Sequence, residues 1–355
     1  MNELPVMSES EGIVLFHPHV PSQAIEEVTQ VLQSRWIGQG PRVAQFEKEF
    51  SRRFAGAGSS VAVGSGTDAL HLAYILADLK AGDEVIVTCT ATNIPFLYMG
   101  VTVRFADVDP ETLNINVNHV RELVNERTKA IVCVHYGGLP CDLDELLAIA
   151  HTWNIPVIED AAHAPGATYR GKRIGEISPF TMFSFQAIKH ITTGDGGMLV
   201  IQDPTLVPKA ERIRWFGIDR SNKQKGTWEN DITEVGYKYQ MTDIGAAMGL
   251  ASLHEFDQIL GHRQKLFEAY KKGLSGASGI KLIGAQATDR THAAWLCTAL
   301  IEHNRVGFMY HLRENKIESG QVHYRNDRYS IFGGRRADLP HMDSVEDRYI
   351  VLPLH

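Results

Sequence analysis

The chain has 355 residues, enough for a large domain and a smaller one, because single domains typically run to about 100–200 residues. Its hydrophobic fraction of 44% and charged fraction of 22% are ordinary for a globular protein. The formal net charge of −7 argues against a nucleic-acid partner and against an anionic membrane surface, since both attract basic patches.

Alternating strands and helices follow an amphipathic helix that begins near Pro21. Short apolar runs bounded by turn residues predict the strands. Several connections between them are long enough to hold a helix, which favours an α/β fold with a mostly parallel sheet covered on both faces. The predicted strands cover residues 61–63, 84–88, 102–106, 130–135, 156–159, 180–185 and 198–202.

The pattern changes beyond about Met248, where a long helical stretch runs to Tyr270. Strand-like pieces follow at 294–300 and 320–324. We interpret this part as a smaller α+β domain that the long helix joins to the first. The predicted domains are therefore a large one over residues 12–247 and a small C-terminal one over residues 248–355.

A lysine and an acid stand at the ends of two predicted strands. Lys189 follows one strand, and Asp160 ends another. A pyridoxal phosphate (PLP) enzyme needs this pair: an amine for the Schiff base, and a carboxylate that keeps the pyridine nitrogen protonated so that the ring accepts electrons. Open α/β sheets bind ligands at this edge. A single lysine after a strand is usually a solvated surface residue, so the hypothesis depends on the combination.

A glycine-containing turn lies upstream of both residues. The strand at 61–63 leads into Gly64-Ser65-Gly66-Thr67, which opens an apolar-periodic helix. Glycines let the backbone approach a phosphate, and a helix N-terminus offers free N–H donors. Ser184 adds a hydroxyl for the same phosphate. The alternative is an ordinary strand-to-helix turn in which Thr67 caps the helix.

Six motifs follow one another along the chain. They are residues 36–43 (WIGQGPRV) with 46–47 (FE), 64–70 (GSGTDAL), 107–115 (DVDPETLNI), 159–164 (EDAAHA), 183–197 (FSFQAIKHITTGDGG) and 236–243 (GYKYQMTD). In this order they resemble the DegT-type sugar aminotransferases, a family of fold type I PLP enzymes, over nearly the whole chain. The resemblance implies PLP as cofactor, the larger domain as the cofactor-binding one, and a homodimer with shared active sites. Relatives usually continue into a final helix beyond the position of His355.

The resemblance also implies a role for each site residue. Lys189 forms the Schiff base and, once free, moves a proton between the amino acid and the cofactor. Asp160 partners the pyridine nitrogen. His163 lies near the cofactor ring as a donor to its phenolic oxygen, the alternative being a satisfied structural histidine. The residues expected to hold the phosphate are Gly66, Thr67 and Ser184.

The chain departs from the common family pattern at three places. Where many relatives have an aromatic residue on the cofactor ring, this chain has Cys89, which we expect to contact the ring instead. The loop there looks about three residues shorter than in relatives. Lys238 stands where many relatives have Asn, in a segment that reaches the neighbouring subunit's site. We expect Lys238 to offer a cation there, unless it is a solvated surface lysine. The triplet 325–327 (RND) replaces a more usual proline, and we expect substrate choice to differ there.

The expected activity is transfer of an amino group from an amino acid, L-glutamate, to the keto group of a sugar, in particular a nucleotide-linked keto-deoxy sugar. Ping-pong kinetics follow from a covalent carrier. One alternative is dehydration of a keto-deoxy sugar, because such family members have histidine in place of the lysine, and here His190 follows Lys189. A second alternative is a regulatory protein that binds the cofactor.

No apolar run is long enough to span a bilayer, and the first residues have neither the basic region nor the apolar core of a signal peptide. We therefore expect a cytoplasmic protein. His17 and His19 have no acid or cysteine beside them in the sequence, and the cysteines show no metal-ligand spacing, so we expect reduced thiols and no metal site. The four cysteines are Cys89, Cys133, Cys141 and Cys297.

Overall fold

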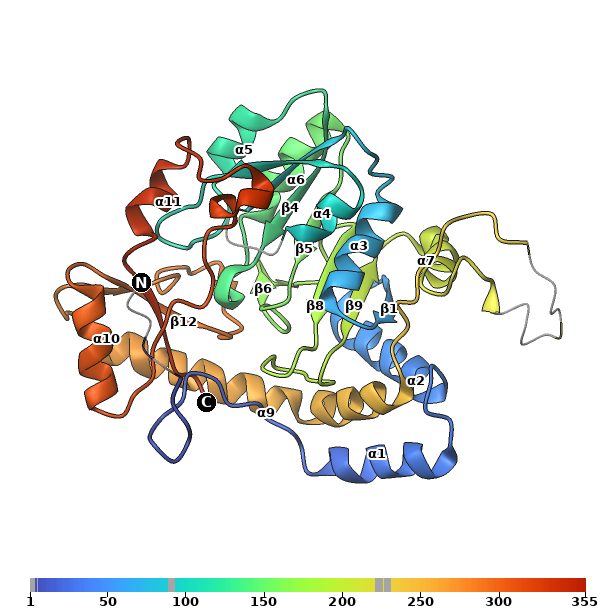
Figure 1. The fold of residues 1–355 in the computed structure, drawn as a ribbon, viewed down its shortest axis with the longest axis horizontal. Coiled ribbons are helices and arrows are strands. Elements are labelled where there is room, and N and C mark those ends of the chain that lie inside the picture. Colours follow the sequence, from blue (N-terminus) through green and yellow to red (C-terminus); the bar gives the residue numbers. More distant parts are fainter. Residues whose placement is uncertain (1–3, 5, 89–92, 221–225, 227–230) are drawn as a thin grey trace.

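Figure 1 shows the computed structural model, which describes residues 4, 6–88, 93–220, 226 and 231–355. Its centre is a seven-stranded sheet with the order β1-β9-β8-β5-β4-β2-β3, in which β9 alone runs antiparallel to its neighbours. The mostly parallel sheet is therefore confirmed. Its strands are β1 (Ser59–Val63), β2 (Glu84–Thr88), β3 (Thr102–Ala106), β4 (Thr128–Val134), β5 (Val157–Asp160), β8 (Phe180–Ser184) and β9 (Gly197–Ile201).

Both faces of this sheet are buried, because alternate side chains of a strand point to opposite faces. In β1, Val61 and Val63 belong to one apolar core and Ala62 to the other. Helix α3 (Gly66–Leu76) packs in the first core. Helices α2 (Pro41–Phe50) and α6 (Leu143–Trp153) pack in the second. The sheet thus forms the middle layer of the larger part of the molecule (Figure 1).

A single long helix, α9 (Asp243–Gly273), runs across the lower part of the molecule in Figure 1 and packs in two apolar cores. Phe256 packs with the second core of the large sheet, whereas Phe267 packs with the C-terminal strands. The expected boundary between residues 247 and 248 falls inside this helix, and the division into two domains stays a prediction. The other α-helices of the described residues are α1 (Gln23–Ser34), α4 (Ile94–Tyr98), α5 (Val117–Leu123), α7 (Val207–Ile213), α10 (Arg305–Glu314) and α11 (Pro340–Val345).

Two small antiparallel sheets complete the fold. The first has the order β10-β12-β13, formed by β10 (Ile280–Leu282), β12 (Cys297–Ile301) and β13 (Tyr349–Leu352). The second has the order β11-β6-β7, formed by β11 (Arg290–Thr291), β6 (Thr168–Tyr169) and β7 (Lys172–Arg173).

The strand predicted at 320–324 is wrong. This segment makes one isolated bridge, between Gly320 and Val351, and then leaves the sheet. Its next residue, Gln321, bonds the carbonyl of Glu346 through its side chain instead of extending the ladder. Among the helices of the described residues, none has both the length and the hydrophobicity that a bilayer crossing requires.

Candidate active site

The lysine and the acid singled out from the sequence lie at one edge of the large sheet. Strands β5 and β8 are parallel neighbours, with Asp160 paired opposite Met182, so their C-terminal ends lie side by side. Asp160 is the last residue of β5, and Lys189 lies in the turn that follows β8. The backbone N–H of Lys189 donates to the carbonyl of Gln186, which closes that turn. The topology therefore brings an amine and a carboxylate to the same edge.

A cavity of about 330 Å³ opens at this edge. Residues from β5, β8, the start of α3 and the C-terminal part of the chain line it. Of the eight predicted site residues, the six on its wall are Gly66, Thr67, Asp160, His163, Ser184 and Lys189. Cys89 lies outside the described residues. Lys238 is described but does not line this cavity.

The turn before α3 forms a close cradle with β8. Ser65 is the helix N-cap, and its Oγ accepts the N–H of Asp68 at 3.0 Å. The alternative with Thr67 as the cap is therefore wrong, because the helix already begins at Gly66. A Cβ at Gly66 would lie 3.0 Å from Cβ of Ser184, so only glycine leaves space between the turn and that serine. The first N–H groups of a helix have no intrahelical acceptor and suit an anion.

The amine of Lys189 lies against an aromatic ring, and the residue as a whole is half-buried. Its Nζ is 3.4 Å from the ring centroid of Trp295. Burial lowers the pKa of Lys189 to about 7, against an opposing increase from the charge of Asp160. The amine is therefore ready to act as a nucleophile and as a proton carrier near neutral pH.

Asp160 is buried, and burial raises its pKa. The N–H of Ala162, which donates to Oδ1 at 3.0 Å, and the charge of Lys189 act in the opposite direction. Within the part of the chain that the structure describes, the bond from Ala162 is the one hydrogen bond found for the carboxylate, and Asp160 lines the cavity. Its position on the wall, at the end of β5, matches the role expected for a partner of a protonated ring nitrogen.

His163 is buried and stacks on Trp295, with ring centroids 3.8 Å apart and planes 16° from parallel. Its Nδ1 has no hydrogen-bond partner among the described residues. Burial lowers the pKa of His163 well below its usual value, and the nearby Lys189 and His323 lower it further, so the ring is neutral. A buried nitrogen without a partner favours contact with a ligand over the alternative of a satisfied structural histidine.

Lys238 is exposed, and its Nζ is 5.3 Å from the ring centroid of Trp215. Its segment runs beside the turn at residues 64–67, which we call the phosphate turn. The carbonyl of the next residue, Tyr239, accepts the N–H of Gly64 at 2.6 Å. Lys238 therefore lies close to this turn but does not line the cavity of its own chain. A solvated lysine and a cation offered to a neighbouring subunit both fit this position.

Two of the wall residues that the sequence did not predict carry rings that approach Lys189 or His163. Trp295 precedes β12, and His323 comes from the segment wrongly predicted as a strand. Burial lowers the pKa of His323 to about 4. Neither belongs to a local motif, and only the contact between distant parts of the chain brings them to the cavity. From the sequence alone, an aromatic residue before a predicted strand cannot be distinguished from one that packs in the core.

The triplet at 325–327 does not reach the cavity. The Arg325 side chain is fully buried, and its guanidinium donates to both carboxylate oxygens of Asp327 at 2.7 Å. It also bonds Asp343 of α11. A guanidinium with these partners holds the C-terminal part together and is not available to a substrate. Arg325 therefore has a structural role in this chain, and the expectation that substrate choice differs at the triplet stays a prediction.

His190, the basis of the dehydratase alternative, is buried and does not line the cavity. Its Nε2 lies 2.7 Å from the carbonyl of Ala293, and Nε2–H donates to that oxygen. Lys189 and not His190 therefore presents its side chain to the site. This geometry favours amino transfer over the dehydration that a histidine at the lysine position would indicate.

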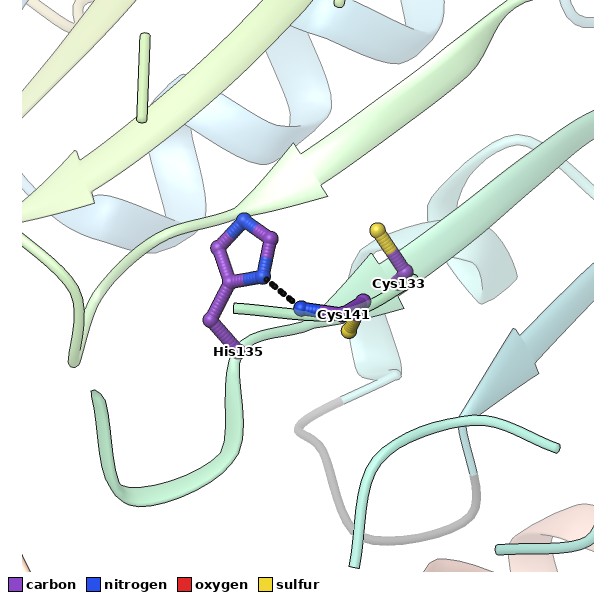
Figure 2. Close-up of side chains that lie close together, drawn as sticks. All are labelled: Cys133, His135 and Cys141. Atoms are coloured by element: carbon purple, nitrogen blue, oxygen red, sulfur yellow. Dashed lines mark hydrogen bonds between the residues drawn. The ribbon is translucent and has the colours of Figure 1, made fainter. Parts of the chain in front are cut away.

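Figure 2 shows Cys133, His135 and Cys141, whose ligand atoms lie within 4.8 Å of one another in the buried interior. The sequence spacing did not predict this group. Nδ1 of His135 accepts the backbone N–H of Cys141 at 3.0 Å, and Nε2–H donates to Glu159 at 2.7 Å. Both ring nitrogens are thus occupied, and a metal would have to displace one of these bonds. We assign the group a structural role that ties β4 to β5 next to Asp160.

The pH dependence of cofactor capture provides a test of Lys189. The cofactor-free protein should react with PLP at a rate that rises through about pH 7, because the pKa of Lys189 is lowered to about 7 and only the neutral amine attacks a carbonyl. Stopped-flow absorbance between pH 5.5 and 9.5 measures the midpoint. A midpoint near the ordinary lysine value of about 10.4 would contradict the buried amine.

The residues on the wall fit PLP. The cradle of Gly66 and Ser184 suits its phosphate, Asp160 its pyridine nitrogen, and the free Nδ1 of His163 its phenolic oxygen. The amine of Lys189, on the same wall, suits its aldehyde. The arrangement therefore offers a separate chemical partner to each polar part of that cofactor.

Comparisons with known proteins agree with this geometry. GDP-perosamine synthase from Escherichia coli O157:H7 is 32% identical to this chain over 96% of it and 93% of the relative. The sugar aminotransferase CalS13 from Micromonospora echinospora superposes with a TM-score of 0.90 at 34% identity, covering 96% of this chain and 94% of CalS13. Spr1654 from Streptococcus pneumoniae in its PLP form superposes with a TM-score of 0.89 at 27% identity, covering 97% and 94%.

The family model of the DegT/DnrJ/EryC1/StrS aminotransferases matches residues 18–355. That range contains every predicted site residue and all seven strands of the large sheet. The aminotransferases of this family depend on PLP, and the expected resemblance is confirmed. The chain belongs to the DegT/DnrJ/EryC1/StrS aminotransferase family.

Proposed function

We propose that this PLP-dependent sugar aminotransferase moves an amino group from L-glutamate to the keto group of a nucleotide-linked deoxy sugar. One observation carries the proposal: Lys189 and Asp160 face a single cavity from two parallel neighbouring strands, beside a phosphate cradle. The name of the relative GDP-perosamine synthase supports a nucleotide-linked sugar as the acceptor.

PLP, when bound, supplies the electron sink that makes the bond at the amino-bearing carbon labile. Each protein group then has a limited task. Lys189 carries a proton to and from that carbon, which a pKa of about 7 permits near neutral pH. Asp160 keeps the ring nitrogen protonated. His163 orients the phenolic oxygen, while Gly66, Thr67 and Ser184 hold the phosphate.

Both proposed substrates carry negative charge, yet Lys189 is the only lysine or arginine among the described residues of the cavity wall. Carboxylates and phosphates are held best by cations. We therefore propose a homodimer in which Lys238 of the partner subunit completes the site. The exposed position of Lys238, outside its own cavity and next to the phosphate turn, supports this arrangement.

Mixing two inactive variants tests the shared site. Lys189→Ala and Lys238→Ala homodimers should each be impaired, whereas subunit exchange should restore about a quarter of the wild-type sites. If Lys238 acts in the partner's site, a mixed dimer has one site that lacks both lysines and one site that keeps both. If Lys238 acted within its own chain, each site of the mixed dimer would lack one of the two lysines. Activity after mixing would then stay at the average of the two variants.

The proposed substrates are tested in two half-reactions. L-glutamate should convert the PLP absorption band of the loaded protein to that of the amine form and release 2-oxoglutarate. The amine-loaded protein should then convert nucleotide-linked 3-keto and 4-keto-6-deoxyhexoses, made enzymatically, to amino sugars that mass spectrometry identifies. A bleached band without any amino sugar would reject the acceptor. Loss of a hydroxyl without gain of nitrogen would favour the dehydratase alternative.

A further inference from the structure

Trp295 connects the C-terminal part of the chain to the lysine turn. It is 2% exposed, and its backbone N–H donates to the carbonyl of Gly137 at 3.0 Å. Its indole Nε1–H donates to the carbonyl of Ile188 at 3.1 Å. Ile188 is the residue directly before Lys189, so this bond fixes the backbone from which the reactive side chain departs.

The indole ring also touches two of the proposed catalytic side chains. Nζ of Lys189 is 3.4 Å from the ring centroid, and the ring of His163 stacks on it at 3.8 Å. These two side chains come from the turns after β8 and β5. One residue therefore contacts the amine, the backbone before the amine and the ring that faces the cofactor.

An indole face attracts an ammonium because the face of the ring carries partial negative charge, and the attraction is larger where water is excluded. Asp160 also attracts this ammonium, since its charge raises the pKa of Lys189. The ring of Trp295 offers the amine a second, uncharged contact. This contact can hold the amine near the reacting carbon while Lys189 is not covalently bound.

We propose that Trp295 is a positioning residue that holds the free amine of Lys189 over its ring and fixes the plane of His163. The proposal rests on the proposed function, in which Lys189 is the reactive amine. The part that can be tested without turnover is the contact between amine and ring. A substitution that removes the ring but keeps an apolar side chain distinguishes an effect of the ring face from an effect of packing volume.

Trp295→Phe and Trp295→Met make that comparison, because both side chains are apolar and similar in volume but only Phe has a ring face. The readout is the rate of PLP capture by the cofactor-free protein as a function of pH. Phe should keep the limiting rate within about 3-fold of the wild type, whereas Met should lower it by about 10-fold or more. The midpoint for Met should also fall by about one pH unit, because the ammonium loses its attraction to the ring. Trp153→Met, at an exposed tryptophan, is the matched control.

Equal rates and midpoints for Phe and Met would overturn the proposal, since the ring face would then have no role. A second measurement does not depend on these variants folding. In the cofactor-free wild type, tryptophan fluorescence should titrate with the same midpoint as PLP capture, and this change should be absent in Lys189→Ala. Absence of the titration in the wild type would overturn the contact. A wild type that captures no PLP would instead reject the proposed function, whatever the fluorescence shows.

Discussion

Lys189→Ala is expected to lower amino transfer from L-glutamate by about 10⁴-fold or more, because one side chain both binds the cofactor covalently and carries the proton. The amine is the only lysine or arginine group that the described residues place on the cavity wall. A single-turnover measurement of the loss of the PLP absorption band after addition of L-glutamate gives the rate.

The matched control is Lys172→Ala, at an exposed lysine on β7 that does not line the cavity. It should keep the wild-type rate. A small primary amine, such as methylamine, should restore part of the lost rate in Lys189→Ala if that residue moves the proton. Retention of more than about 1% of the wild-type rate without added amine would contradict the role of Lys189.

The parts of the fold that the sequence predicts are those with a local physical signal. The seven strands of the large sheet are short apolar runs between turn residues, and all are found with ends shifted by at most about two residues. The position of Asp160 and Lys189 at one edge follows from parallel neighbouring strands. The phosphate turn is likewise visible because glycine and the helix N-terminus occur in one segment.

Features that depend on contacts between distant residues could not be predicted. Trp295 reaches the cavity only because the chain returns to Gly137 and Ile188 after more than a hundred residues. The sequence marks the triplet 325–327 only as a departure from relatives, and it does not reveal that Asp343 and Asp327 bind the guanidinium of Arg325. The group of Cys133, His135 and Cys141 has no recognisable spacing, since a loop of five residues separates the last two. Only the packed structure decides which polar groups are already satisfied.

Asp160→Asn should lower the rate of amino transfer by about 10²–10³-fold while PLP remains bound. The amide oxygen can still accept the N–H of Ala162, so the turn after β5 keeps its geometry. The phosphate cradle, which lies on other elements, is unchanged. The variant removes the negative charge that would keep the ring nitrogen protonated, and the electron sink weakens as a result. Cofactor content and the single-turnover rate are measured on the same sample.

The same substitution has an effect that needs no substrate. The charge of Asp160 raises the pKa of Lys189, so its removal should move the midpoint of PLP capture below the wild-type value of about 7. Asp203→Asn, at an exposed acid outside the cavity, should change neither the rate nor the midpoint. A slower reaction with an unchanged midpoint would show that Asp160 acts on the cofactor but not on the lysine. An unchanged rate would contradict its role altogether, because no other described acid on the wall ends a strand beside Lys189.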